Sequence, residues 1–333
     1  MIERPAESTE LDLYALVEGF FRTEFSTDNP IITEAVRRMI AAGGKRLRPR
    51  VALLAVEVNG GDPREHLALA AYMELIHVAT LIHDDVVDRA STRRGVNATA
   101  IDFGNRVSVL AGDYLLAWIF KNVTANYPAP VPHILSATLA DICDGEVLQL
   151  RALGDLGCTV AQYTETVLKK TAALFSASAE CGAIMAGASL LRVRALRDFG
   201  RYYGIAFQML DDLLDLTASE AELGKPVGND LGERKMTLPL ILALERADPE
   251  FRAAVGRFYA RRADESSAPE PIAGLIAGVR RFGGIERTRE AIAGYVERAR
   301  MSLAPLGAAS GRGPLAELAE ALNQSGNRPV PSA

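Results

Sequence analysis

Two copies of one acidic pattern contain the residues of this chain that are best suited to chemistry. The pattern occurs in LIHDDVVD and again in QMLDDLLD, and its carboxylates are Asp84, Asp85, Asp88, Asp211, Asp212 and Asp215. Because residues four apart share one face of a helix, each copy aligns its first and last aspartate. Such carboxylates are costly to bury unless a cation compensates them. The pattern therefore predicts a site for hard divalent cations, and it favours magnesium, which also accepts phosphate oxygens from a substrate.

A solvated helix face is the alternative interpretation of either copy taken alone. The residues around both copies argue against it, because they are apolar and the acidic pair interrupts the apolar stripe. The sequence between the copies shows no further repeat at the same spacing. We therefore expect two helices of one bundle that converge on one site.

Basic residues gather in four clusters close to turns. They are Lys45, Arg46 and Arg48 in GGKRLRP, the pair Arg93 and Arg94 before Gly95, the pair Lys169 and Lys170 before Thr171, and Lys225 with Lys235. Arginine binds phosphate through two parallel hydrogen bonds, and lysine supplies a point charge. Each cluster alone is typical of a solvated surface. Beside two acidic motifs of the metal-binding type, the four clusters together predict two diphosphate pockets.

The composition is that of a globular helical chain. Hydrophobic residues make up 49% and aromatic residues 6%, which favours packed helices over a β-sandwich. The net charge of −5 argues against a general affinity for nucleic acid. The charged start is not typical of a signal peptide, and no uncharged run approaches the roughly 18 apolar residues that span a bilayer. Three cysteines without metal-site spacing, Cys143, Cys158 and Cys181, predict buried free thiols in a reducing cytoplasm.

Helices are the elements expected to position these residues. Helical periodicity predicts helices over 11–25, 30–42, 48–58, 64–90, 105–126, 132–152, 159–186, 192–217, 236–246, 249–262, 270–280 and 284–305. Strand-like alternation is absent, and short clusters of glycine and proline separate the helices. The sequence thus predicts one all-α domain over residues 1–322, followed by a disordered tail over 323–333.

The ordered motifs of the chain resemble those of the trans-isoprenyl diphosphate synthases, also called polyprenyl synthetases. They are GGKRLRP (43–49), ELIHVATLIHDDVVD (74–88), RRG (93–95), GDYLL (112–116), GEVLQL (145–150), KKTAALF (169–175), FQMLDDLLD (207–215) and GKPVGNDLGERKMTLPL (224–240). The resemblance implies an isoprenoid-synthase helical bundle around a central active-site cavity, usually a homodimer. It also implies a reaction in which isopentenyl diphosphate condenses with an allylic prenyl diphosphate and pyrophosphate is released.

The resemblance further implies a role for each matching residue. About three magnesium ions bind the substrate complex through Asp84, Asp85, Asp88, Asp211, Asp212 and Asp215, with Asp84, Asp88 and Asp211 closest to the chemistry. The allylic diphosphate is held by Arg93, Lys170, Lys225 and Lys235, and isopentenyl diphosphate by Lys45, Arg48, His77 and Arg94. Thr171 and Gln208 match polar groups near the developing carbocation.

Two small residues upstream of the first motif bear on product length. Ala79 and Thr80 lie about 6 to 7.5 Å along the helix from Asp84, at the level where bulky residues stop elongation in the resembling family. Their size favours an all-trans product longer than geranylgeranyl, suited to a quinone side chain and to delivery at a membrane surface. Tyr72, Trp118 and Phe120 are candidates for a deeper floor.

Several alternatives stay open at this point. A geranylgeranyl or farnesyl diphosphate synthase is the nearest. A terpene cyclase would generally lack GGKRLRP and a second complete acidic motif, and a non-catalytic subunit would normally have lost aspartates or the basic loop. One departure from the family pattern is Arg234, where many members have glycine. This arginine could add a phosphate contact, point to solvent or shift the loop that carries Lys235.

Overall fold

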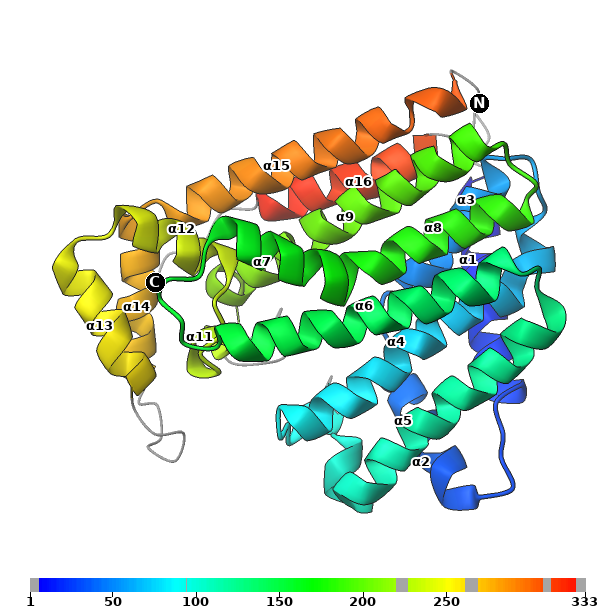
Figure 1. Ribbon diagram of the computed structural model, residues 1–333, viewed down its shortest axis with the longest axis horizontal. Coiled ribbons are helices and arrows are strands. Elements are labelled where there is room, and N and C mark those ends of the chain that lie inside the picture. The colour runs from blue at the N-terminus through cyan, green and yellow to red at the C-terminus, as the bar shows by residue number, and fades with distance from the viewer. Residues whose placement is uncertain (1–5, 94, 220–226, 261–268, 308–312, 328–333) are drawn as a thin grey trace. The chain divides into compact units, whose positions relative to one another are not determined.

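The computed structural model describes residues 6–93, 95–219, 227–260, 269–307 and 313–327. Most of these residues are helical (Figure 1), which confirms the all-α fold class. Their contacts group them into two compact units. Unit 1 comprises the described residues up to Ala137 together with Ala177–Arg197, and unit 2 comprises Thr138–Ser176, Asp198–Gly307 and the described residues from Gly313 onward. The single domain expected over residues 1–322 stays a prediction.

Unit 1 is built around one apolar helix. Its elements are α1 (Ala6–Thr23), α2 (Pro30–Ala41), α3 (Leu47–Glu57), a 3-10 turn (Pro63–His66), α4 (Leu67–Val87) and α5 (Thr99–Asn126). Apolar side chains occupy nearly every face of α4, so this helix is buried almost all round and contacts α1, α2, α3 and α5. The first acidic motif lies where α4 ends.

The segment Pro63–Val87 is long and apolar enough, by length and composition alone, to cross a membrane. No segment of this kind was expected from the sequence, because the run sought there was both apolar and uncharged. Pro63–Val87 meets the length and composition criterion because only a few charged residues interrupt its apolar residues. Of its most apolar window, 67% is buried inside the protein. Its buried Glu74 accepts a hydrogen bond from Arg46. Both properties are those of a core helix.

Unit 2 carries the second acidic motif on α9. Its elements are the greater part of α6 (Pro130–Ala152), α7 (Val160–Val167), a π-helical turn (Leu168–Ala172), the start of α8 (Ala173–Met185), the greater part of α9 (Leu190–Thr217), α11 (Asn229–Gly232), α12 (Leu238–Arg246), α13 (Pro249–Ala260), α14 (Pro269–Arg281), α15 (Gly284–Ser302), a 3-10 turn (Ala304–Leu306) and α16 (Gly313–Gly326). The apolar α12 is buried from Leu238 to Leu244 and contacts α7, α14 and α15. Figure 1 shows α16 running beside α15, and the two helices contact each other.

Periodicity located most helices but not their interruptions. The helix expected over 159–186 is broken by the π-helical turn, and α5 is interrupted at Gly104, whose backbone (φ 78°, ψ 157°) is open to glycine. A small antiparallel hairpin was not predicted. Its strands, β1 (Thr92–Arg93) and β2 (Val96–Asn97), are too short to show alternation in the sequence.

The expected tail begins later than predicted, because α16 continues past Asn323 to Gly326. The buried Leu322 holds this helix against its unit, and Arg289 Nε donates to the Gly326 carbonyl at 2.9 Å. A helix whose last carbonyl groups find partners does not fray. Residues 328–333 lie outside the described residues.

The cysteine prediction is wrong at one position. Cys158 and Cys181 are buried free thiols, and burial raises the pKa of both. Cys143 is exposed, because it lies on the outward face of α6 next to the buried Ile142.

Candidate active site

The three carboxylates of the first motif lie at the end of α4 and differ in burial. Asp85 is fully buried, Asp84 is half-buried, and Asp88 caps the helix as an exposed residue. The helix stops because Arg89 adopts a left-handed backbone (φ 52°), while the Ala90 N–H donates to the Asp85 carbonyl at 2.9 Å. Glycine usually occupies such a left-handed position, but here the residue is Arg89. The turn fixes the position of Asp88 at the end of the helix.

Asp85 is paired with an arginine of the hairpin. Arg93 on β1 donates from Nε and Nη2 to Asp85 Oδ1, at 2.8 and 2.5 Å. Burial raises the pKa of Asp85, and the charge of Arg93 opposes that rise. Asp85 Oδ2 is buried without a hydrogen-bond partner among the described residues. The pair therefore fixes the position of Arg93, whose predicted role is to hold the allylic diphosphate.

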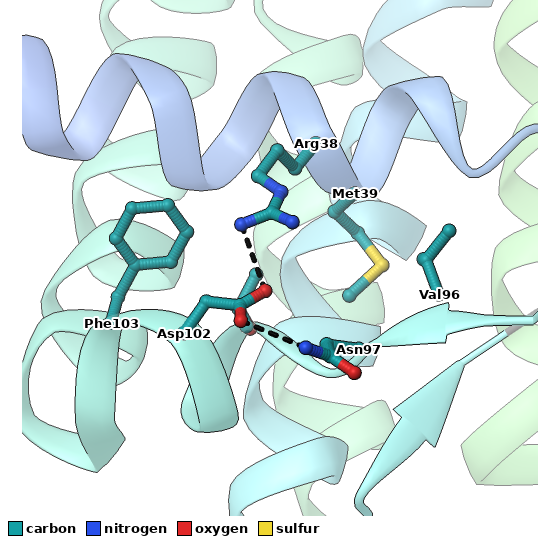
Figure 2. A pocket seen from close by; sticks show the side chains of 7 residues that line it. Arg38, Met39, Val96, Asn97, Asp102 and Phe103 are labelled. Atoms are coloured by element: carbon teal, nitrogen blue, oxygen red, sulfur yellow. Dashed lines mark hydrogen bonds and ion pairs between the residues drawn. The ribbon is translucent and has the colours of Figure 1, made fainter.

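The opposite side of the hairpin is anchored to α2 and α5. Asp102 accepts a hydrogen bond from Asn97 Nδ2 at 2.9 Å and an ion pair from Arg38 Nη1 at 2.8 Å. Figure 2 shows these three side chains meeting at a small pocket, where the Arg38 guanidinium also lies over the Phe103 ring. The hairpin that carries Arg93 is thus held at both ends. Arg94, predicted to contact isopentenyl diphosphate, lies outside the described residues.

The GGKRLRP loop separates its cations. Arg46 is buried with a left-handed backbone (φ 47°) at the start of α3. It donates to Glu18 at 2.6 Å, to Glu74 at 3.3 Å and to the Ile40 carbonyl at 2.8 Å. Arg46 therefore anchors the loop, which corrects its grouping with the phosphate-binding cations. Lys45 is exposed next to it, and Arg48 lies largely buried in the first turn of α3.

The remaining predicted residues of unit 1 belong to α4. Ala79 is fully buried, His77 and Thr80 are half-buried, and Thr80 Oγ1 donates to the His77 carbonyl at 2.8 Å. His83 packs against α5, with Nε2 3.2 Å from the Val109 carbonyl. A Cβ at Gly112 would lie 2.3 Å from that nitrogen, which explains the glycine of the GDYLL motif.

The second motif, on α9, ties two of its three carboxylates to the protein. Asp212 is buried and accepts from Tyr163 Oη at 2.6 Å and from Gln208 Nε2 at 2.9 Å. Burial, with the nearby charge of Asp230, raises the pKa of Asp212 to about 7. The buried Asp215 accepts from the Asp230 N–H at 3.1 Å and so holds the start of α11. Asp211 is exposed.

The π-helical turn carries Lys170, which contacts α6, and Thr171, which contacts α9. Lys170 Nζ donates to Gln149 at 2.6 Å and pairs with Glu146, both from α6. A Cβ at Gly145 would lie 2.4 Å from the Lys170 backbone nitrogen, so the GEVLQL motif needs its glycine here. Thr171 Oγ1 donates to Gln208 at 2.8 Å. Single-turn π-helices often mark functional sites.

Lys235 follows a backbone turn that explains why glycine suits position 234, whereas nothing in the described residues explains the arginine. Arg234 has a left-handed backbone (φ 60°), the Lys235 N–H donates to the Asp230 carbonyl at 2.9 Å, and Lys235 Nζ lies 2.5 Å from Glu233. Glycine adopts this conformation without cost, whereas arginine is strained by about 1 kcal/mol. Lys225, also predicted to hold the allylic diphosphate, lies outside the described residues.

Sequence reasoning missed three supporting residues: Tyr163, Glu146 and Gln149. The last two lie in GEVLQL, so the motif itself was a signal for them. Tyr163 stands 49 residues before Asp212, and nothing in the sequence connects the two.

Magnesium fits the carboxylates of the two motifs that are not buried. In the part of the chain that the structure describes, no three His, Cys, Asp or Glu side chains gather to hold a metal ion by themselves. Asp84, Asp88 and Asp211 are the motif residues whose carboxylates are not buried. Magnesium suits so few protein ligands, because it keeps water and takes further oxygens from a substrate phosphate. Metal binding by all six aspartates stays a prediction.

Comparison with known proteins gives concordant matches. Residues 29–274 match the family model of polyprenyl synthetase. The octaprenyl diphosphate synthase of Escherichia coli is 37% identical over 289 residues, covering 87% of this chain and 88% of that protein. A short chain isoprenyl diphosphate synthase of Methanothermobacter thermautotrophicus is 38% identical over 293 residues, covering 87% and 89%. The crystal structure of a polyprenyl synthase from Caulobacter crescentus, complexed with calcium and isoprenyl diphosphate, matches with a TM-score of 0.86 at 36% identity, covering 97% of this chain and 95% of that one.

Proposed function

Because this chain belongs to the polyprenyl synthetase family, we propose that it is a trans-prenyltransferase which condenses isopentenyl diphosphate with an allylic prenyl diphosphate. The observation that carries the proposal is the pair of acidic motifs, each of which combines carboxylates that are buried and held by the protein with carboxylates that are not buried. The product is an all-trans polyprenyl diphosphate longer than geranylgeranyl diphosphate, and pyrophosphate is released.

The chemistry follows from the charges around the substrates. The allylic C–O bond breaks with its electron pair on the leaving pyrophosphate, whose growing charge Arg93, Lys170 and Lys235 stabilise. The isopentenyl double bond attacks the allylic cation and forms the new C–C bond. A proton then leaves the adduct, and pyrophosphate accepts it. Lys45 and Arg48 hold the isopentenyl diphosphate in position for this attack.

Magnesium is the proposed metal. When bound at Asp84, Asp88 and Asp211, it would neutralise the leaving diphosphate. Carboxylate oxygens suit hard divalent cations in general, and the calcium in the Caulobacter crescentus relative belongs to the same class of ion.

Product length depends on the face of α4 that carries the small residues. A growing tail would pass Ala79 and Thr80 before it met a bulky side chain. Tyr72 lies on the same face as Ala79, two turns or about 10 Å further along the helix. Its ring contacts those of Phe20 at 5.8 Å and Trp118 at 5.8 Å, so it is braced against displacement. This aromatic cluster is the proposed floor, and it lies deeper than a floor at Ala79 would.

A homodimer in the cytoplasm is the proposed state of the enzyme. The support is a run of exposed apolar side chains on α5, namely Ile101, Val109, Leu110 and Tyr114, of which Leu110 is 60% exposed. A second copy of the chain would cover such a surface. The long apolar product would then be delivered to a membrane surface.

A short-chain synthase is the second candidate, because a short-chain relative is as similar to this chain as the octaprenyl synthase is. The deciding experiment incubates purified protein with radiolabelled isopentenyl diphosphate, magnesium and each allylic primer, and separates the dephosphorylated products by chromatography. Products longer than geranylgeraniol support the proposal, and the Ala79→Phe variant should then stop at farnesyl or geranylgeranyl length. A wild-type enzyme that already stops there would favour the second candidate.

A further inference from the structure

Four side chains of unit 2 form a chain of hydrogen bonds that runs inward from the second acidic motif. Tyr163 Oη donates to Asp212 Oδ2 at 2.6 Å, and Gln208 Nε2 donates to Asp212 Oδ1 at 2.9 Å. Thr171 Oγ1 donates to Gln208 Oε1 at 2.8 Å. Tyr163, Asp212 and Thr171 are all buried. Gln208 between them is half-buried. Three of the four side chains therefore lie within the protein, where hydrogen bonds are stronger than in water.

The direction of these bonds is set at Asp212. Both oxygens of the Asp212 carboxylate accept, one from the Tyr163 hydroxyl and the other from the Gln208 amide. Gln208 then has to present its NH2 group to Asp212, which leaves its carbonyl oxygen facing Thr171. Thr171 must donate to that oxygen. Its hydroxyl hydrogen is held toward Gln208, and the lone pairs of its oxygen are left for another group.

Neighbouring threonines show that the arrangement of Thr171 is unusual for a helix. Thr164 and Thr166, one to two turns earlier, each donate to the carbonyl four residues before them, at 2.7 and 3.1 Å. This is the ordinary bond of a helical threonine. Thr171 instead donates across to α9, and it does so from the π-helical turn.

We propose that Tyr163 is a positioning residue which, through Asp212 and Gln208, orients the Thr171 hydroxyl so that its oxygen lone pairs face the allylic cation. The proposal rests on the proposed function and extends it, since it assigns a role to a residue outside every acidic and basic motif. A cation is stabilised by the negative end of a fixed dipole. The chain of hydrogen bonds from Tyr163 through Asp212 and Gln208 to Thr171, called the relay below, supplies such a dipole. The orientation of this dipole needs no adjustment during the reaction.

The test is a double-mutant cycle on turnover in the full-length enzyme, with Tyr163→Phe, Thr171→Val and the combined variant. Tyr163→Phe should lower kcat about tenfold and change KM for either substrate less than twofold, because it removes one buried hydrogen bond and leaves the residues predicted to hold the diphosphates unchanged. Once Thr171 has lost its hydroxyl, the relay has no end to orient. Adding Tyr163→Phe to Thr171→Val should therefore lower kcat less than twofold further.

Three further variants keep the outcome interpretable. Tyr202→Phe removes a hydroxyl from α9 whose ring packs on Tyr295, and it should keep wild-type kcat. Thr171→Ser keeps the hydroxyl and should restore most of the turnover that Thr171→Val loses. If Tyr163→Phe does not fold, Gln208→Glu replaces the donor that faces Asp212 and should couple to Thr171→Val in the same way.

The outcomes separate the relay from the reaction. Additive effects of Tyr163→Phe and Thr171→Val, or an unchanged kcat in Tyr163→Phe, would overturn the relay while leaving prenyl transfer by the wild-type enzyme intact. A wild-type enzyme without prenyl transfer would overturn the proposed function and the relay with it.

Discussion

The two acidic motifs share a sequence pattern but differ in what the protein does with their carboxylates. In the first, the buried Asp85 accepts from Arg93, whereas Asp84 is half-buried and Asp88 is exposed. In the second, Asp212 and Asp215 are both held by protein donors, and Asp211 alone is exposed. The pattern therefore does not say how many carboxylates of each copy are buried and held by the protein itself. Partners brought by the fold decide that number.

The partner chosen by each motif also differs in chemistry. Asp85 meets an arginine, so its pair is ionic and fixes a residue predicted to bind diphosphate. Asp212 meets a phenol and an amide, so its bonds are directional and orient other polar groups. One motif thus positions a charge, and the other positions dipoles.

The largest effect is expected from removing a motif carboxylate that is not buried. Asp84→Ala or Asp211→Ala should lower kcat by about a thousandfold or more, because charge stabilisation by metal is worth several kcal/mol. Steady-state turnover at saturating magnesium measures this, with circular dichroism as the control for folding. Near-wild-type turnover in either variant would show that its carboxylate does not bind metal.

The ionic pair of the first motif should matter most for stability. Arg93→Ala leaves the carboxylate of Asp85 buried without its cation, which should lower the free energy of unfolding by about 3 kcal/mol at neutral pH. Urea denaturation of the metal-free protein measures it. The control is Arg300→Ala, whose pair with Glu297 is exposed and should contribute less than about 0.5 kcal/mol. Equal losses in the two variants would show that Asp85 does not depend on Arg93.

The basic loops should separate the two substrates. Lys45→Ala should raise the KM for isopentenyl diphosphate about tenfold and change the KM for the allylic substrate less, while Lys225→Ala should do the reverse. Initial rates at varied concentrations of each substrate measure the two constants. The same change in both constants for either variant would mean that the pockets are assigned wrongly.

The smallest effect concerns the strained turn before Lys235. Arg234→Gly should raise the free energy of unfolding by about 0.5 kcal/mol, since it removes the strain of a left-handed arginine but adds freedom to the unfolded chain. Thermal unfolding detects this as a small rise in Tm. Arg234→Ala keeps the strain and removes the side chain, so it should bring no gain. A gain from alanine as large as that from glycine would point to the side chain and not to the backbone.

Sequence patterns predicted the helices and the acidic motifs because both depend on local spacing. Helix α4 and the aspartates at its end follow from periodicity alone. The inward turn of Arg46 could not be predicted, because it depends on Glu18 and Glu74, each 28 residues away, and on a left-handed backbone. The same holds for Tyr163, whose partner is set by packing between helices that are distant in sequence. Residues predicted to bind substrate lie in recognisable sequence motifs. Residues whose partners are other side chains can be identified only once the fold is known.

The most direct test of this account is a crystal structure with manganese in place of magnesium and a slowly reacting thiolo analogue of the allylic diphosphate. Anomalous scattering should place the metal ions on Asp84, Asp88 and Asp211. The bonds from Arg93 to Asp85 and from Tyr163 to Asp212 should persist. Metal ions bound by Asp85 or Asp212, with those bonds broken, would contradict the division between ligands that are not buried and anchors that are.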